Sequence, residues 1–164
     1  MAASSFIYNA AKAMGMTLTG VVSSTHNLCY WSSTTASYYI TLVSNNYVPN
    51  EGHFYASAFS GAECGAASFT SGFNGTMRIS LTGRILNVNQ TSNQVEFQCS
   101  QVSWAGIAAA NGTAHAFVII QQSGSDALSP LITYNSLGGF PITFNGTTLT
   151  LSLTSAGIFA GVDF

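Results

Sequence analysis

The sequence predicts an all-β fold, namely an antiparallel β-sandwich or barrel of the jelly-roll type, formed by a single β domain over residues 1–164. Short runs rich in β-branched and aromatic residues recur along the chain. Clusters of Gly, Asn, Ser and Pro separate these runs at intervals of about 8 to 12 residues. This spacing is typical of antiparallel strands joined by short turns.

Residues 1–20 are expected to form either a short helix or an extended N-terminal arm. The helix is suggested by apolar residues at helical spacing, with Ser4 or Ser5 as a cap and Gly15 as a terminator. The segment is short, so the extended arm is an equal alternative. A self-contained β core does not require it, and we expect Phe6, Ile7 and Tyr8 to reach a neighbouring molecule.

A firm strand is predicted at Tyr38–Val43, within a β-rich stretch over residues 28–43. Residues 44–75 then form a long irregular excursion, with a short helix expected at 53–59. Loops longer than about 15 residues are uncommon in compact domains unless they have a function. We therefore expect residues 44–75 to be a contact loop.

Regular strands are predicted in the second half of the chain. They are expected at residues 76–88 with a bulge at Gly83, at 95–99, at 102–107, and twice within 147–163. Residues 114–150 predict a meander, with strands at 116–120 and 131–134 and a third strand in the following segment. Asn145-Gly146 is the strongest short hairpin signal in this stretch.

The composition excludes several classes of function. Charged residues make up 5% of the chain and hydrophobic residues 47%, with a net charge of -2. Lys12, Arg78 and Arg84 are too few cations for a nucleic-acid surface or a polybasic membrane patch. The sequence shows no export signal and no apolar run of the 18 or so residues that a membrane span needs. An odd number of cysteines argues against a closed disulfide framework, so we expect reduced thiols and synthesis in a cytoplasm.

The residues that carry chemistry are few and scattered, which predicts no enzyme, no metal and no cofactor. The candidate soft ligands are His26, His53, His115, Cys29, Cys64 and Cys99, and only His26 and Cys29 have a spacing seen in zinc sites. The carboxylates are Glu51, Glu63, Glu96, Asp126 and Asp163. We expect Asp126 to bond local backbone in its Ser-Gly-Ser-Asp turn, and Glu96 to pair with Arg78 or Arg84. No catalytic, cofactor-binding or metal-binding residue is predicted.

Aromatic side chains leave one competing interpretation open. The candidates for exposed rings are Trp31, Tyr38, Tyr39, Tyr47, Phe54 and Tyr55. Such rings could stack on sugars, as in a lectin, but tyrosine and tryptophan also fill β cores with their polar tips outward, which we favour. The four N-x-S/T sequons at Asn74, Asn89, Asn111 and Asn145 are interpreted as turns.

Two stretches resemble a known family. The segments SDALSPLITY (125–134) and GGFPITFNGTTLTLSL (138–153), together with IYNAAK (7–12), resemble motifs of small structural proteins of tailed bacteriophages. Members of that family carry a similar LYNAAK opening and a similar SPLIAY…G-x-P-x-T-x-N-G segment, although they are usually more acidic than this chain. The matched stretches cover about a fifth of the 164 residues.

The resemblance implies a virion structural protein, in particular a capsid decoration or cement protein on the capsid exterior, made in the bacterial host cytoplasm. Its partners would be the major capsid protein and copies of itself, in a dimer or trimer. A head–tail connector or tail component and a glycan-binding β-sandwich are the alternatives. Because the chain has few charges, we expect attachment by apolar burial and by pairing at strand edges.

Overall fold

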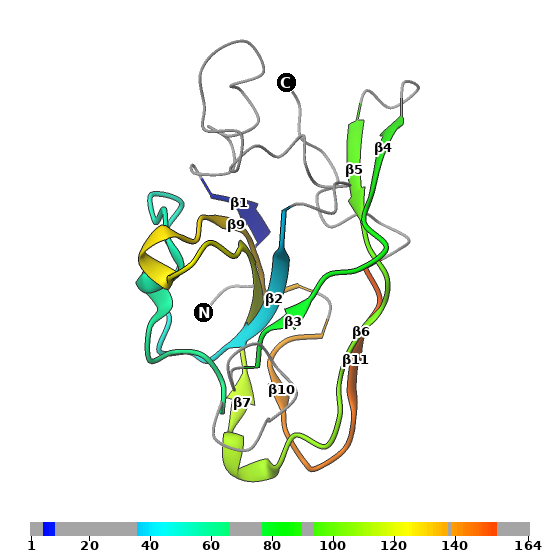
Figure 1. Ribbon diagram of the computed structural model, residues 1–164. Helices are drawn as coiled ribbons and strands as arrows, with labels where there is room; N and C mark the ends of the chain where they lie inside the picture. The colour runs from blue at the N-terminus through cyan, green and yellow to red at the C-terminus, as the bar shows by residue number, and fades with distance from the viewer. Residues whose placement is uncertain (1–4, 9–35, 66–76, 90–93, 138, 154–164) are drawn as a thin grey trace.

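The computed structural model describes residues 5–8, 36–65, 77–89, 94–137 and 139–153 (Figure 1). The strands are β1 (Ser5–Ile7), β2 (Tyr38–Val43), β3 (Ile79–Ser80), β4 (Ile85–Asn89), β5 (Gln94–Gln98), β6 (Val102–Trp104), β7 (Thr113–Ala114), β8 (Ala116–Gln121), β9 (Leu131–Asn135), β10 (Ile142–Thr143) and β11 (Leu149–Leu151). The 3-10 helices are η2 (Ala56–Phe59), η5 (Ala109–Asn111) and η6 (Asp126–Leu128). All strand pairs in these ranges are antiparallel, which confirms the all-β prediction.

A five-stranded sheet with the order β1-β9-β8-β2-β3 forms the centre of the domain. Its longest pairing runs from Tyr38 opposite Gln121 to Val43 opposite Ala116. Every residue of β8 is buried, because β8 lies between β9 and β2 and both faces of the sheet are covered. This double covering explains why the sequence of β8 is a continuous apolar run rather than an alternating one.

A register shift in β9 sets which side chains reach each face. Ile119 pairs with Thr133 and Ile120 with Leu131, so Ile132 is an additional residue in β9. In a regular strand, residues three apart face opposite sides. Leu131 and Tyr134 nevertheless belong to the same core cluster, because the additional residue Ile132 shifts the alternation of side chains by one position.

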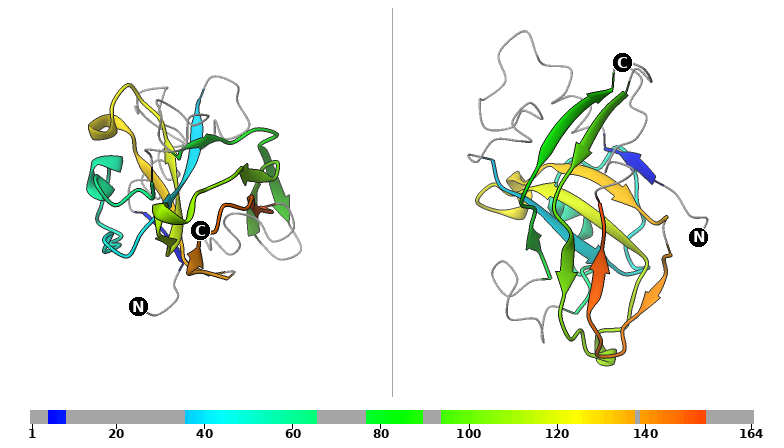
Figure 2. Two further views of the ribbon diagram at one scale, coloured as in Figure 1. Left: turned by 90° about the horizontal axis from the view of Figure 1, so that it is seen from below. Right: turned by 90° about the vertical axis from the view of Figure 1, so that its right-hand side faces the viewer.

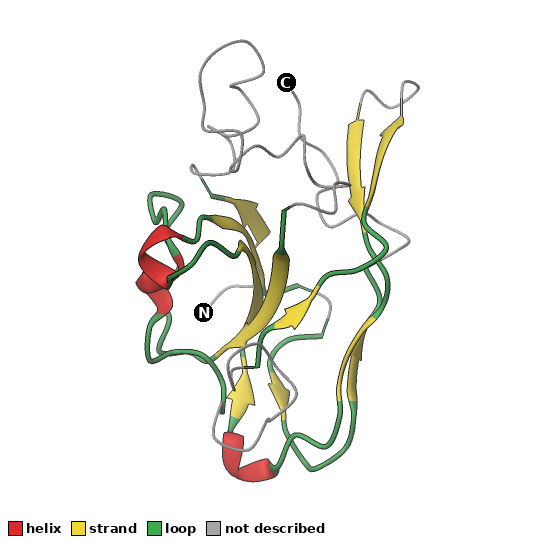
Figure 3. Cartoon of the chain, in the orientation of Figure 1, coloured by secondary structure: helices red, strands yellow, loops and turns green. Residues whose placement is uncertain are grey.

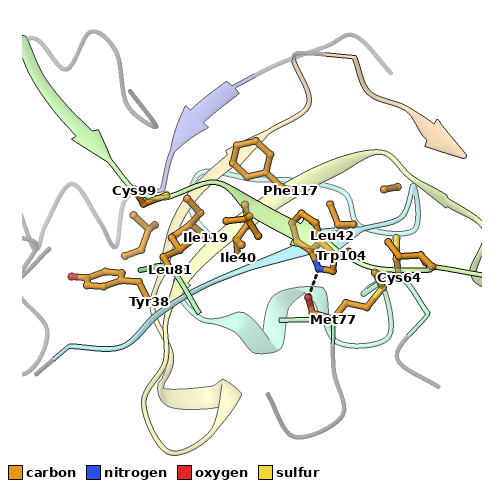
Figure 4. Packing of buried hydrophobic residues seen from close by; sticks show 14 of the residues in the cluster. Tyr38, Ile40, Leu42, Cys64, Met77, Leu81, Cys99, Trp104, Phe117 and Ile119 are labelled. Atoms are coloured by element: carbon orange, nitrogen blue, oxygen red, sulfur yellow. Dashed lines mark hydrogen bonds between the residues drawn. The ribbon is translucent and has the colours of Figure 1, made fainter. Parts of the chain in front are cut away.

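The first core cluster lies between the sheet and the pair formed by β6 and β11 (Figure 2, right). Ile40 and Leu42 of β2 and Phe117 and Ile119 of β8 pack there around Trp104 of β6 (Figure 4). The indole nitrogen of fully buried Trp104 donates a hydrogen bond to the Met77 carbonyl oxygen at 2.7 Å. The core therefore satisfies the polar atom of its largest side chain.

The opposite face of the sheet is covered by residues 44–65, which contain η2, and η6 lies beside η2 (Figures 1 and 3). Ala56, Phe59 and Ala62 pack there on Val118 and Ile120 of β8. Apolar side chains of residues 44–65 therefore help to fill the second core cluster, and the interpretation of this segment as a contact loop stays a prediction. The short helix predicted at 53–59 corresponds to η2, and residues 66–75 of the predicted loop lie outside the described residues.

The N-terminal segment forms an extended arm where it is described. Residues 5–7 pair as β1 with β9, so the helix prediction is wrong at these positions. Tyr8 is fully buried in the second core cluster, and its backbone nitrogen donates to the Ile132 carbonyl oxygen at 3.1 Å. Tyr8 is thus part of the core, contrary to the expectation that it reaches outward. The remainder of residues 1–20 lies outside the described residues.

The predicted meander is correct only for β8 and β9. Strand β10 pairs with β7 and β11 pairs with β6, so Asn145-Gly146 joins two different strand pairs instead of closing a hairpin. Asn145 still forms a local turn, in which its Oδ1 accepts from the Thr147 backbone nitrogen at 3.1 Å, and Gly146 has φ +87°. Gly83 has φ +57° in the bend between β3 and β4, and the strands predicted beyond residue 153 lie outside the described residues.

Candidate functional site

Residues 44–65 and 122–130 together form what we call the covering layer of the five-stranded sheet. A backbone hydrogen bond from Ala56 N to Ser129 O joins the two segments, and one from Leu131 N of β9 to Phe54 O joins the first segment to the sheet; each is 2.9 Å long. Tyr55 and Pro130 form an isolated antiparallel bridge, and η2 contacts η6. Figure 3 shows these two helices side by side. The layer is therefore fixed in place although it has almost no regular strand.

Arg78 is the centre of an ionic cluster beneath this layer, and its side chain is 3% exposed. Its Nε and Nη2 donate to the two carboxylate oxygens of Glu63, both at 2.9 Å. Its Nη1 and Nη2 donate to the two oxygens of Asp126, at 2.6 and 2.9 Å. The guanidinium carbon also lies 5.6 Å from the centre of the Phe59 ring. The cluster connects the end of the 44–65 segment, the start of β3 and η6.

The electrostatics of the cluster favour its ionised form. Burial alone would lower the pKa of Arg78, but the hydrogen bonds with Asp126 and Glu63 outweigh it and raise that pKa above its usual value. The same hydrogen bond lowers the pKa of Asp126 below its usual value. Glu63 and Asp126 are thus counter-ions of Arg78, which leaves them poorly suited to act as an acid and a base.

One sequence prediction about these charges is wrong. The Asp126 carboxylate binds Arg78 and not its local backbone, because η6 holds it beside the guanidinium. Arg78 binds Glu63 as well as Asp126, and the predicted pairing of Glu96 with Arg78 or Arg84 stays a prediction, because the Glu96 side chain lies outside the described part of the chain. Arg84 stacks over the Tyr38 ring at 4.9 Å, and burial lowers its pKa. Two of the three basic residues are therefore engaged with the domain itself.

A chain of hydrogen bonds links the N-terminal arm to the covering layer. The hydroxyls of Tyr8 and Tyr47 are 2.7 Å apart, and the Tyr47 hydroxyl lies 3.0 Å from His53 Nδ1. Burial raises the pKa of both tyrosines, so both are neutral phenols at physiological pH. The Tyr47 ring also packs edge-on against Phe59. The arrangement fastens the arm to the layer and supplies no charged nucleophile.

The predicted soft ligands are not brought together in the described part of the chain. No group of three or more His, Cys, Asp or Glu residues that could hold a metal occurs there. Cys64 and Cys99 are buried, and burial raises their pKa values to about 12 and about 11, so both are neutral thiols. His53 bonds Tyr47, and the His115 backbone nitrogen donates to Val43 O. His26 and Cys29 lie outside the described residues, as does Asp163.

The predicted aromatic positions separate into core and surface. Tyr38 and Tyr47 are buried, which makes the exposed interpretation wrong for them, and Tyr39 is half-buried. Phe54 and Tyr55 are 47% and 44% exposed, and their ring centres are 6.3 Å apart. Leu128 of η6, which sequence reasoning did not single out, is 58% exposed. We call Phe54, Tyr55 and Leu128 the apolar patch; Trp31 lies outside the described residues.

The apolar patch gathers exposed apolar side chains from both segments of the covering layer. It combines two aromatic rings and a leucine on two segments that hydrogen bonds hold together. Clustered exposed apolar side chains on a protein surface mark interaction sites more often than scattered ones do. Val48 is also exposed in the same layer. The layer thus presents a preformed apolar surface toward solvent.

The sequons are consistent with turns where the structure describes them. Asn111 ends η5 before Gly112, which has φ +84°, and Asn145 forms the turn described above. Asn89 ends β4, and Asn74 lies outside the described residues. Within the described ranges, no helix is long and apolar enough to cross a membrane.

Comparisons with protein-family models, with curated proteins and with solved structures found no match for this chain.

Proposed function

We propose that this chain is a bacteriophage virion structural protein, namely a capsid decoration or cement protein on the outside of the shell. Its partners are the major capsid protein and copies of itself. The virion assignment is supported by the motifs at residues 7–12, 125–134 and 138–153. The mode of attachment is supported by one structural observation, the apolar patch of Phe54, Tyr55 and Leu128 on the covering layer.

Attachment through this patch is apolar in character. Beneath the layer Glu63 and Asp126 neutralise the positive charge of Arg78 and leave one net negative charge, so the cluster offers little charge to a partner. Aromatic side chains at the centre of an interface commonly supply most of its binding energy. Removing the two rings is therefore expected to cost at least about 2 kcal/mol of binding free energy, a loss of about 30-fold in affinity.

The test is co-sedimentation with shells of the same phage prepared without this protein. Phe54→Ser with Tyr55→Ser, and Leu128→Ser separately, should reduce the bound fraction, whereas the wild-type protein should stay bound from low to high salt. Leu137→Ser and Ile85→Ser are the matched controls, because both remove an exposed apolar side chain outside the covering layer. Release by high salt, or equal losses in the controls, would show that this surface is not the attachment site.

Glycan binding is the second candidate, and the exposed ring pair of Phe54 and Tyr55 is the observation that favours it. A glycan-binding protein would retain sugars on an array at about millimolar affinity or better and lose them in Tyr55→Ala. A decoration protein would bind shells and ignore soluble glycans. The copy number per particle distinguishes a decoration protein from a head–tail connector or tail component. A decoration protein is present in many copies over the shell, whereas a connector or tail component forms one ring per particle.

We further propose that the all-β domain is a sandwich. The support is that β6 and β11 lie across the first core cluster from the five-stranded sheet (Figure 2). Two strand layers with a shared apolar interior are the defining arrangement of that architecture.

A further inference from the structure

The arm formed by β1 and Tyr8 is a separable element seated in a site that the rest of the domain builds. Strand β1 lies at the edge of the sheet and pairs with β9, with Ser5 opposite Asn135 and Ile7 opposite Thr133. Tyr8 then enters the space between the sheet and the covering layer, where its hydroxyl bonds Tyr47. The seat therefore consists of a strand edge and a buried polar partner for one tyrosine.

This seat needs an occupant. Without the arm, the backbone groups of β9 that pair with β1 lose their partners, and the Tyr47 hydroxyl keeps only its contact with His53. Buried polar groups that lose their hydrogen-bond partners are costly, and an open strand edge invites pairing with another chain. The fold consequently favours states in which an arm of this sequence fills the seat.

The sequence does not restrict the arm to its own domain. In the sheet order β1-β9-β8-β2, the arm is three strand positions from β2, a separation of about 15 Å at the usual strand spacing. About five extended residues would cross that distance. The chain supplies residues 9–35 for the connection, which is far more than the minimum. A connection of that length allows the arm to reach the same seat on an adjacent copy.

We propose that this arm is exchanged between copies of the chain, so that Tyr8 of one copy fills the seat beside Tyr47 of another. The contacts are identical in the two arrangements, because each seat receives the same sequence. The balance between them depends on the concentration of neighbouring seats relative to the effective concentration that the connection sets, so a high protein concentration favours exchange. Exchange is thus favoured wherever copies are held side by side.

The inference concerns the purified chain and does not depend on the proposed capsid function. Its partner is a second copy of this chain, recognised by strand pairing and by one tyrosine. Failure of the exchange would leave attachment through the apolar patch untouched, and failure of capsid binding would leave the exchange untouched.

The test uses cysteines at positions that the register places opposite each other. Paired residues of antiparallel strands have Cα atoms about 4.5 to 5.5 Å apart, within the range of a disulfide. Two proteins are prepared in a background with Cys29, Cys64 and Cys99 replaced by alanine, one with Ser5→Cys and the other with Asn135→Cys. They are mixed at about 1 mM, oxidised and separated on a non-reducing gel.

Exchange predicts a covalent heterodimer that disappears on reduction and that Tyr8→Ala in the Ser5→Cys chain strongly diminishes. The control pair, Ser5→Cys with Thr150→Cys, should yield little dimer, because Thr150 is an exposed residue of β11 that does not pair with β1. A chain carrying both Ser5→Cys and Asn135→Cys should close on itself when dilute and link to other chains when concentrated. If the mixed single-cysteine chains form no more dimer than the control pair, the proposal is wrong.

Discussion

Replacement of Arg78 by methionine tests whether the buried ionic cluster holds the covering layer on the sheet. Methionine retains much of the apolar stem but removes the donors that bind Glu63 and Asp126. Removing one partner from a buried ion pair costs about 3 to 5 kcal/mol, because the remaining charge stays desolvated. The two carboxylates left behind are not equivalent, since the Glu63 side chain is 16% exposed and the Asp126 side chain is 41% exposed.

The expected cost follows from this difference in exposure. Asp126 can rehydrate in place, so Asp126→Asn should cost only about 1 kcal/mol, as for an exposed pair. Glu63 remains largely buried, and its orphaned carboxylate should account for most of a loss of about 3 kcal/mol in Arg78→Met. Adding Glu63→Gln to Arg78→Met removes the orphaned charge and should restore about 1 kcal/mol or more.

The assay is equilibrium unfolding in urea followed by tryptophan fluorescence, for which buried Trp104 is a reporter. Arg84→Met is the matched control, because Arg84 stacks on Tyr38 and should contribute only about 0.5 to 1 kcal/mol. A loss below about 0.5 kcal/mol in Arg78→Met would contradict the reasoning. So would a double variant with Glu63→Gln that is less stable than Arg78→Met alone.

Three further predictions concern the pH dependence of stability, the reactivity of the buried thiols and the Trp104 hydrogen bond. The pKa of Asp126 is lower in the folded chain than its unfolded value of about 3.9, because of its hydrogen bond with Arg78. The stabilisation from this carboxylate is therefore complete above the unfolded pKa and is lost as the pH falls through the folded pKa. Below pH 4, the free energy of unfolding should consequently depend less on pH in Arg78→Met than in the wild type, as urea unfolding at several pH values would measure. Cys64 and Cys99 should react with a thiol reagent at pH 8 only after denaturation when measured in a Cys29→Ser background, because burial raises their pKa values to about 12 and about 11, and rapid labelling of the native protein would contradict their placement. Trp104→Phe should lower the free energy of unfolding by about 1 to 3 kcal/mol, because the buried Met77 carbonyl loses its donor, and an unchanged urea midpoint would count against that hydrogen bond.

The local signals in the sequence predicted strands well. Tyr38–Val43 and Ala116–Ile120 are β-branched and aromatic runs whose patterns do not depend on a distant partner, and both form strands at nearly the predicted bounds. Asn145-Gly146 shows the limit of such signals. It does form a turn, but the strands on its two sides pair with β7 and β6, and pairing is decided by the assembled core rather than by the turn.

The candidate site was less predictable because it depends on contacts between distant segments. Glu63, Arg78 and Asp126 lie far apart in the sequence, and only the folded layer shows that both carboxylates bind the one guanidinium. The contact between Tyr8 and Tyr47 gave no sequence signal, because the two residues are 39 positions apart, yet together they fill the space between sheet and layer. Leu128 gave no signal at all, since its exposure results from the position of η6 beside η2.

Cryo-electron microscopy of the intact phage particle tests the central claim most directly. The proposal predicts repeated density for this β domain over the outer surface of the shell, with Phe54, Tyr55 and Leu128 directed toward the major capsid protein. Density restricted to a single vertex or to the tail would contradict a decoration role. Density on the shell with the covering layer facing away from the capsid would contradict attachment through the apolar patch.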